Sequence, residues 1–176
     1  MPRAFVAVGS NVAPETNVRR ALLLLAREVR LLGISTFYQT KPIDRPDQPP
    51  FCNGVVEIET ELPPRELKHS LLHRIERELG RLRTEDKYAP RAIDLDLLLY
   101  DDLALETEGL LLPDPEIERR PFLAIPLAEL APELILPGKG VRMGEVAARL
   151  AGAEMRPLPE YSALLRKEVA HEPGKS

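Results

Sequence analysis

The feature that most limits the fold of this chain is the order in which its hydrophobic periodicities change. Four runs are short and either apolar or alternating, as strands are: 4–8, 34–40, 51–60 and 92–100. Two longer runs are amphipathic, as helices are: 14–32 and 64–79. The resulting order of strand, helix, strand, strand, helix, strand predicts the split βαβ arrangement of a ferredoxin-like α+β fold. We expect a mixed, mostly antiparallel sheet covered by the two helices.

The rest of the chain adds shorter elements to this sheet. We expect a hairpin near 99–113, helices near 119–130 and 143–151, and a frayed tail from about 165 to 176. With 176 residues, 44% of them hydrophobic, the chain has the size of one domain with its own core. The sequence therefore predicts a single domain over 1–176 with extra C-terminal helices.

Composition and charge argue against several classes of protein. Apolar stretches such as ALLLLA at 21–26 are too short to span a bilayer, and the N-terminus lacks a signal-peptide pattern. Cys52 is the only cysteine, so one chain forms neither an internal disulfide nor a cysteine-based zinc cluster. The net charge of −4 argues against binding nucleic acid through a broad basic surface. We expect a cytoplasmic protein with no membrane or nucleic-acid partner.

Two aspartates alternate with hydrophobic residues in the predicted strand 92–100. Side chains alternate between the faces of a strand, so Asp94 and Asp96 share one face, with Cα atoms roughly 6.5 Å apart. Carboxylate oxygens are hard ligands that suit Mg²⁺, and such a pair can hold one or two ions against a polyphosphate. The same D-x-D pattern is also typical of the solvated face of an amphipathic strand.

A basic loop at 81–91 comes directly before this strand. Pro90 excludes a helix there, and the loop carries four basic side chains: Arg81, Arg83, Lys87 and Arg91. Phosphoryl transfer needs metal ions, arginine forks on the phosphate oxygens and the exclusion of water. The loop and the aspartates together favour metal–phosphate chemistry, with 81–91 closing over a nucleotide. The alternative is that this segment is simply a solvated charged loop.

A second group of residues suits a flat organic substrate. Phe51 and Asn53 stand together at the start of a predicted strand, and Phe122 follows the doublet at 119–120. Two aromatic rings can stack on the faces of a heterocycle while one amide binds its polar edge. Each phenylalanine taken alone is also compatible with a place in the core.

The motifs above occur together in one known family. From FVAVGSN at 5–11 to APELILP at 131–137, and above all in KYAPRAIDLDLL at 87–98, the chain resembles the 6-hydroxymethyl-7,8-dihydropterin pyrophosphokinases of folate biosynthesis. The resemblance implies a ferredoxin-like enzyme that transfers the β,γ-pyrophosphoryl unit of ATP to the pterin hydroxymethyl oxygen and releases AMP. It also implies two Mg²⁺ ions, ATP as co-substrate and no obligate protein partner.

The resemblance also implies roles for individual residues on the nucleotide side. Asp94 and Asp96 match the metal ligands. Six other positions match residues that bind ATP or close over it: Arg81, Arg83, Arg91, Glu76, Tyr88 and Arg120. Of these, the three arginines of the segment 81–91 also match residues with catalytic roles.

On the pterin side, the resemblance implies a stacking pair and an amide that binds the edge of the ring. The matching positions are Phe51 and Phe122 for the stacking pair, Asn53 for the amide, and Thr40 and Pro42 for the pocket wall. Two positions depart from the family pattern: Pro113-Asp114-Pro115 stands where Pro-His-Pro is usual, and Asp44 stands where a glycine commonly follows Thr-x-Pro. An aspartate cannot donate a hydrogen bond to a phosphate and repels it unless a cation intervenes.

Two other interpretations fit parts of the same pattern. A ferredoxin-like regulatory module could bind a nucleotide or another small ligand without turning it over. A D-x-D nucleotidyltransferase or glycosyltransferase would act on a sugar nucleotide and ignore the pterin.

Overall fold

A four-stranded antiparallel sheet forms the centre of the computed structural model, which describes residues 1–43, 46–80 and 92–172. The strands β1 (Arg3–Ser10), β2 (Arg30–Ile34), β4 (Phe51–Glu59) and β5 (Asp94–Tyr100) lie in the order β5-β1-β4-β2. Each neighbouring pair is antiparallel. The order is that of the split βαβ arrangement, so the predicted ferredoxin-like fold is confirmed. The parallel component that we expected of a mixed sheet is absent from the pairings within the described ranges.

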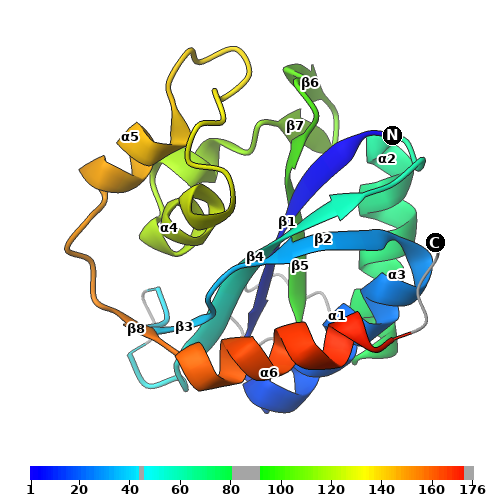
Figure 1. Cartoon of the computed structure of the whole chain (residues 1–176), viewed down its shortest axis with the longest axis vertical. Coiled ribbons are helices and arrows are strands. Elements are labelled where there is room, and N and C mark those ends of the chain that lie inside the picture. The colour runs from blue at the N-terminus through cyan, green and yellow to red at the C-terminus, as the bar shows by residue number, and fades with distance from the viewer. Residues whose placement is uncertain (44–45, 81–91, 173–176) are drawn as a thin grey trace.

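Two short strands extend the sheet at one end. β4 is long enough to pair with β2 along its second half and with β3 (Tyr38–Thr40) along its first half. The free edge of β3 pairs in turn with β8 (Met155–Pro157), so a segment near the C-terminus completes the sheet next to Thr40. The split end of the sheet is visible at the lower left of Figure 1.

Helices from both halves of the chain cover one face of the sheet. They are α1 (Pro14–Glu28), α2 (Pro64–Glu66), a π-helical turn η1 (Leu67–Leu72), α3 (His73–Glu78) and α6 (Pro159–Ala170). α1, α2 and α6 each have a proline in the first helical turn, where its missing N–H costs nothing. β1 sends Val6 and Val8 into the hydrophobic core on this face.

A smaller layer covers part of the opposite face. It consists of the 3₁₀ turn η2 (Pro115–Glu118), α4 (Pro121–Leu130) and α5 (Met143–Arg149). Phe5 and Ala7 of β1 point into this second core, because alternate residues of a strand face opposite sides. The predicted hairpin is present as β6 (Leu105–Thr107) and β7 (Leu110–Leu112).

Three predicted boundaries were wrong. The run 34–40 is not one strand, because β2 ends at Ile34 and β3 begins at Tyr38. The amphipathic run 14–32 is not one helix: α1 ends at Glu28, Val29 is extended, and 30–34 forms β2. Apolar residues such as Leu31 suit a helix and a buried strand equally, and the available edge of β4 decides in favour of the strand.

The expected frayed tail was the third wrong boundary. α6 continues to Ala170, and Leu165 is fully buried against the core. Tyr161, Leu165 and Val169 follow one another at four-residue spacing and make the inner face of this helix. None of the helices in the described ranges is long and apolar enough to cross a lipid bilayer.

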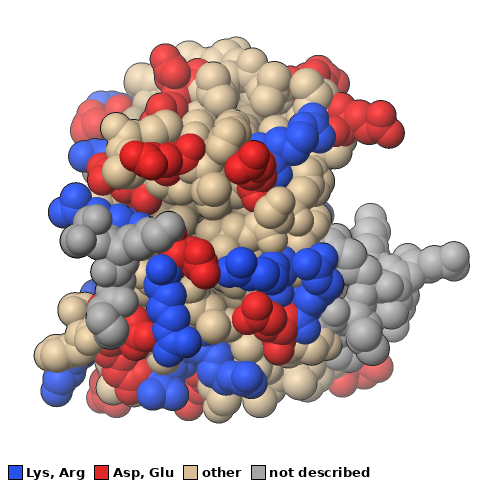
Figure 2. All heavy atoms as spheres, turned by 90° about the vertical axis from the view of Figure 1, so that its right-hand side faces the viewer, with Lys and Arg blue, Asp and Glu red and all other residues tan. Residues whose placement is uncertain are grey.

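Acidic and basic side chains lie next to each other on the side of the molecule that carries α2 and α3 (Figure 2). Arg74 lies 2.9 Å from Glu28 of α1 and 3.5 Å from Glu78 of its own helix, and Arg27 lies 2.6 Å from Glu172. These exposed pairs contribute little stability each. They do, however, connect α1 to α3 on one side and to the residues just after α6 on the other.

Candidate active site

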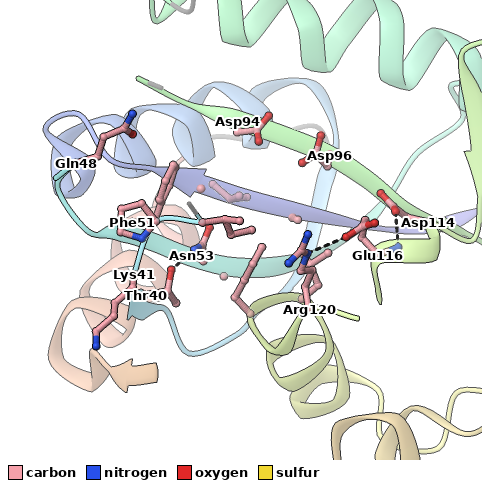
Figure 3. Close-up of a pocket in the computed structure, with 18 residues that line it drawn as sticks. Thr40, Lys41, Gln48, Phe51, Asn53, Asp94, Asp96, Asp114, Glu116 and Arg120 are labelled. Carbon is pink, nitrogen blue, oxygen red and sulfur yellow. Dashed lines mark hydrogen bonds and ion pairs between the residues drawn. The ribbon is translucent and has the colours of Figure 1, made fainter. Parts of the chain in front are cut away.

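A cavity of about 350 Å³ opens on the sheet face that α4 only partly covers (Figure 3). β1, β3, β4 and β5 form its floor, and the 113–123 region forms a wall. The structure brings the following residues of the predicted site together around it: Thr40, Pro42, Phe51, Asn53, Asp94, Asp96, Arg120 and Phe122. The predicted pterin and metal residues therefore share one cavity, although they come from distant parts of the chain.

Asp94 and Asp96 form what we call the carboxylate side of the cavity. They lie on β5, opposite Gly9 and Ala7 of β1, and both side chains point into the cavity in Figure 3. Leu95 is buried in the core on the opposite face of the strand. The predicted alternation is thus confirmed, and it places two carboxylates on one rigid surface.

The carboxylate side is held by one buried hydrogen bond to its strand and one partly buried hydrogen bond just before it. Glu76, which is only 2% exposed, accepts a hydrogen bond from the backbone N–H of Leu95 at 3.0 Å, between the two aspartates. The hydroxyl of Ser10 donates to the carbonyl of Ala92 at 2.6 Å, just before β5 begins. Glu76 does not line the cavity that the described residues form. It contacts the strand, and its expected contact with ATP stays a prediction.

The chemistry of the carboxylate side suits Mg²⁺. Among the described residues, no group of three or more His, Cys, Asp or Glu side chains could hold a metal ion. Mg²⁺ is commonly bound by only one or two carboxylates, with phosphate oxygens and waters completing its octahedron. Asp94 and Asp96 meet this requirement because they face the same open cavity.

Thr40 and Asn53 form the amide side, on β3 and β4. The Asn53 amide nitrogen donates to the Thr40 hydroxyl at 2.7 Å. Its amide oxygen lies against Gly9 of β1, where an added Cβ would stand 2.4 Å from that oxygen. Gly9 is therefore needed for space, and the two contacts together fix the orientation of the Asn53 amide.

Aromatic side chains line the cavity from two elements. Phe51 begins β4, and Phe122 lies in the first turn of α4. Within the described part of the chain these two rings do not contact each other; the ring contacts are Phe37–Tyr161 and His69–His73. The placement of Phe51 and Phe122 is compatible with a flat ligand between them.

Arg120 enters the cavity with an acidic partner that the sequence did not predict. Its Nε donates to Glu116 at 2.8 Å, and Glu116 also lies 3.6 Å from Arg119. Asp114 caps the start of η2, because its carboxylate accepts from the Glu116 backbone N–H at 2.9 Å. Burial raises the pKa of the Asp114 carboxyl above its usual value. Asp114 and Glu116 both line the cavity, so the Arg120 side carries negative as well as positive charge.

Other cavity residues were also missed by the sequence reasoning. Lys41, Ile43 and Gln48 line the cavity from the proline-rich loop between β3 and β4, and Gln48 accepts from the Asn11 side chain at 3.2 Å. The position of Glu116 four residues before Arg120 was the signal for their ion pair. No comparable pattern in the loop pointed to Gln48.

Four predicted nucleotide residues lie outside the described residues: Arg81, Arg83, Tyr88 and Arg91. The expected closure of 81–91 over a nucleotide falls on the same segment.

The sequence is similar to a known family and to individual members of it. The matching family model, described as 7,8-dihydro-6-hydroxymethylpterin-pyrophosphokinase (HPPK), covers residues 5–132. The 2-amino-4-hydroxy-6-hydroxymethyldihydropteridine pyrophosphokinase of Haemophilus influenzae is 38% identical over 144 residues, 80% of this chain and 89% of that protein. The protein of the same name from Bacillus subtilis is 42% identical over 134 residues, 74% of this chain and 79% of its own length.

Solved structures share the fold. The crystal structure of Plasmodium falciparum HPPK-DHPS wild type with SDX-DHP matches with a TM-score of 0.66 at 14% identity, over 85% of this chain. The chain spans 44% of the length of that protein, so the similarity concerns one part of it. The family match over most of the chain and the identity to complete relatives lead to one conclusion: this chain belongs to the 7,8-dihydro-6-hydroxymethylpterin-pyrophosphokinase family.

Proposed function

We propose that this chain transfers the β,γ-pyrophosphoryl unit of ATP to the hydroxymethyl oxygen of 6-hydroxymethyl-7,8-dihydropterin, releasing AMP, as a step of folate synthesis. The observation that carries the proposal is that one cavity holds a carboxylate side and an amide side, separated by β1. The carboxylates suit a metal-bound polyphosphate, and the amide–hydroxyl pair suits the polar edge of a heterocycle. The names of the relatives support the same reaction.

In this reaction the hydroxymethyl oxygen forms a bond to the β-phosphorus of ATP. The bond from the β-phosphorus to the α,β-bridging oxygen breaks, AMP leaves with that oxygen, and the hydroxyl proton is released. Such a transfer asks the protein mainly for positioning and for charge on the phosphate oxygens.

Asp94 and Asp96 would hold Mg²⁺, with two ions as the family resemblance implies. When bound, the cations neutralise charge on the phosphate oxygens. The part played by the chain itself is to keep both carboxylates on one face of a strand that does not shift. The hydrogen bonds of Glu76 with Leu95 and of Ser10 with Ala92 support this role.

The remaining nucleotide contacts are proposed for Arg120 and for the basic segment 81–91. Arg120 lies at the cavity with Nε bonded to Glu116, so its terminal nitrogens are the donors for a phosphate oxygen. Arg81, Arg83 and Arg91 would surround the triphosphate, and Tyr88 would cover the nucleotide. We place Glu76 behind β5, as a support of the aspartates.

The pterin would lie on the amide side. Phe51 and Phe122 would stack on the faces of its ring, and Pro42 would complete the wall. Because Thr40 takes one Asn53 amide hydrogen, the second N–H of that amide is the donor for the pterin edge. We also propose a cytoplasmic location, where ATP is available, and small molecules as the only obligate partners.

The test is to identify the nucleotide product. The full chain is incubated with ATP, Mg²⁺ and 6-hydroxymethyl-7,8-dihydropterin, and the nucleotides are separated by ion-exchange chromatography. We expect AMP to appear in equal amount to the pterin diphosphate, and none without the pterin. ADP as the only product would contradict the proposal.

The other interpretations give different results in the same assay. A regulatory module would bind ATP or the pterin without producing AMP, and a glycosyltransferase or nucleotidyltransferase would turn over a sugar nucleotide instead.

Replacing Mg²⁺ by EDTA tests whether turnover depends on the metal. AMP formation should stop, and it should return when Mg²⁺ is added in excess.

A further inference from the structure

The last part of the chain is bonded to the segment that carries the amide side. The family model ends at residue 132, whereas β8 and α6 lie beyond it. Elements in this position could serve only to cover the sheet. They also, however, form hydrogen bonds with buried residues of the segment 34–40.

Phe37 is the centre of these contacts. Its backbone N–H donates to the Ser162 hydroxyl at 2.8 Å, and its carbonyl accepts from the Leu158 N–H at 2.8 Å. The Ser162 hydroxyl in turn donates to the Leu158 carbonyl at 2.7 Å. Phe37 and Ser162 are both fully buried. Both backbone groups of Phe37 are thus satisfied by the start of α6 rather than by a neighbouring strand.

The Phe37 ring also contacts β4. A Cβ added at Gly54 would stand 2.6 Å from carbons of the ring, so the ring lies directly on the β4 backbone, one residue from Asn53. The ring also meets Tyr161 of α6 edge-on, with 6.4 Å between the ring centroids. Phe37 therefore contacts both α6 and β4.

β8 fixes the neighbouring strand in the same way. β3 has only three residues, with Thr40 paired to Phe51 of β4 on one edge and to Met155 of β8 on the other. A shift of such a strand by one residue would turn its side chains to the opposite face. Thr40 would then lose the Asn53 amide, which it holds at 2.7 Å.

We infer that β8 and α6 are a working part of the pterin site, in which Ser162 is a positioning residue that sets Thr40 through Phe37. The inference rests on the proposed function, since it assumes that the pterin binds at Thr40 and Asn53. Arg166 assists from the next turn of α6, where its Nε donates to the Ile34 carbonyl at 2.9 Å.

α6 also has a second set of anchors, which provides a control. The Tyr161 hydroxyl donates to the Glu15 carbonyl of α1 at 2.7 Å, and Arg19 pairs with Glu168. These contacts hold α6 to α1 and do not involve the segment 34–40. Tyr161→Phe removes one hydrogen bond of α6 and keeps the ring that Phe37 needs.

The experiment compares binding of the two substrates by titration calorimetry on full-length variants, with the pterin alone and with a nonhydrolysable ATP analogue and Mg²⁺. For Ser162→Ala we expect the pterin Kd to rise about tenfold, because Thr40, and with it the Asn53 amide, is held less firmly in the binding position. We expect the Kd of the ATP analogue to change by less than about twofold. Tyr161→Phe should leave both dissociation constants unchanged. If Ser162→Ala does not fold, Arg166→Gln tests the same segment from a half-exposed position.

A double-mutant cycle separates positioning from general loss of stability. If Ser162 acts through Thr40, then Ser162→Ala should weaken pterin binding much less in a Thr40→Val background than in the wild type. Equal weakening in both backgrounds, equal changes for both substrates, or an effect of Tyr161→Phe as large as that of Ser162→Ala would each overturn the inference. A wild-type chain that binds no pterin and makes no AMP would contradict the proposed function instead.

Discussion

The two sides of the cavity differ in how far apart in the sequence their parts lie. Asp94 and Asp96 are neighbours on one face of a single strand, β5. Thr40 and Asn53 come from two strands and are 13 residues apart, and Phe37, which leads to Thr40, is bonded to a residue 125 positions later. Both carboxylates therefore come from one strand, which Glu76 of α3 and Ser10 of β1 support. The amide side depends on the register of β3 with β4, which we infer that β8 and α6 maintain.

The largest effect is expected on the carboxylate side. Asp94→Asn and Asp96→Asn each remove one charged metal ligand and change little in shape, so we expect turnover to fall by about a thousandfold. Pterin binding without ATP should stay within about twofold, because β1 separates the two sides. Steady-state AMP formation and a pterin titration on each variant measure the two quantities. Retained turnover in both variants would show that the metal is held elsewhere.

Glu76→Ala tests whether the carboxylate side depends on its buried support. The substitution leaves the Leu95 N–H without its partner in the core, which costs about 1–3 kcal/mol of unfolding free energy. We expect turnover to fall by roughly tenfold to a hundredfold as the aspartates lose their fixed position. Urea unfolding and AMP formation are measured together.

Glu78→Ala is the matched control for Glu76→Ala. Glu78 lies on the same helix but is exposed, and its partner is Arg74 at 3.5 Å. Its removal should change stability and turnover very little. If both variants lose turnover equally, the effect belongs to α3 as a whole and the specific role of Glu76 is wrong.

Gly9→Ala tests the amide side by filling the space that the Asn53 amide oxygen occupies. The new Cβ would stand 2.4 Å from that oxygen, so the amide must turn and give up its bond to Thr40. We expect the pterin Kd to rise about tenfold, with a smaller change in the Kd of an ATP analogue. Gly33→Ala is the control in β2, because its Cβ would meet the end of the Leu130 side chain at 3.3 Å and Glu57 at an ordinary contact distance of 4.0 Å. Pterin binding unchanged in Gly9→Ala would mean that the Asn53 amide does not contact the ligand.

The same difference between local and distant parts explains what could be predicted from the sequence. The aspartate pair and the order of the strands follow from periodicity within short segments, and both were confirmed. The end of α1 and the structure of α6 were not predicted correctly. Leu31 takes its strand conformation from β4, and Leu165 is ordered by a core to which distant segments contribute. Such choices depend on tertiary contacts that a local pattern does not contain.

The partner of Arg120 shows a further limit of the sequence. An acidic and a basic residue four positions apart, as Glu116 and Arg120 are, form many ion pairs on protein surfaces. This pair matters for the site only because η2 lies at the cavity wall. Ser162 carries even less local signal, because a serine in the first turns of a helix is ordinary. Its importance comes from Phe37, which no spacing connects to it.

The smallest effect is expected at Asp114, which lines the cavity without belonging to either side. Its carboxylate caps η2 by accepting from the Glu116 N–H. Burial raises the pKa of the Asp114 carboxyl, and this outweighs the hydrogen bond from Glu116, which lowers it. A raised pKa in the folded state means that ionisation of Asp114 costs stability as the pH rises above its unfolded value of 3.8. An asparagine at position 114 can still accept the hydrogen bond that caps η2, but it carries no negative charge. Asp114→Asn should therefore gain stability over wild type between about pH 4 and pH 7, and lose that gain in more acid solution.

The same charge decides what Asp114 does to ATP. Removing one partly screened negative charge from the cavity wall should lower the Kd of an ATP analogue about threefold in Asp114→Asn. Asp114→His removes the charge too and adds a donor for phosphate, but it gives up the cap of η2, at a cost of about 1 kcal/mol. Calorimetric titration of both variants separates the two contributions: equal tightening assigns the effect to charge alone, and tighter binding in Asp114→His assigns the remainder to the imidazole. An unchanged Kd in both variants would mean that Asp114 lies too far from the phosphates to affect ATP binding. The charge of Arg120 would then already balance the negative charge of its partner Glu116.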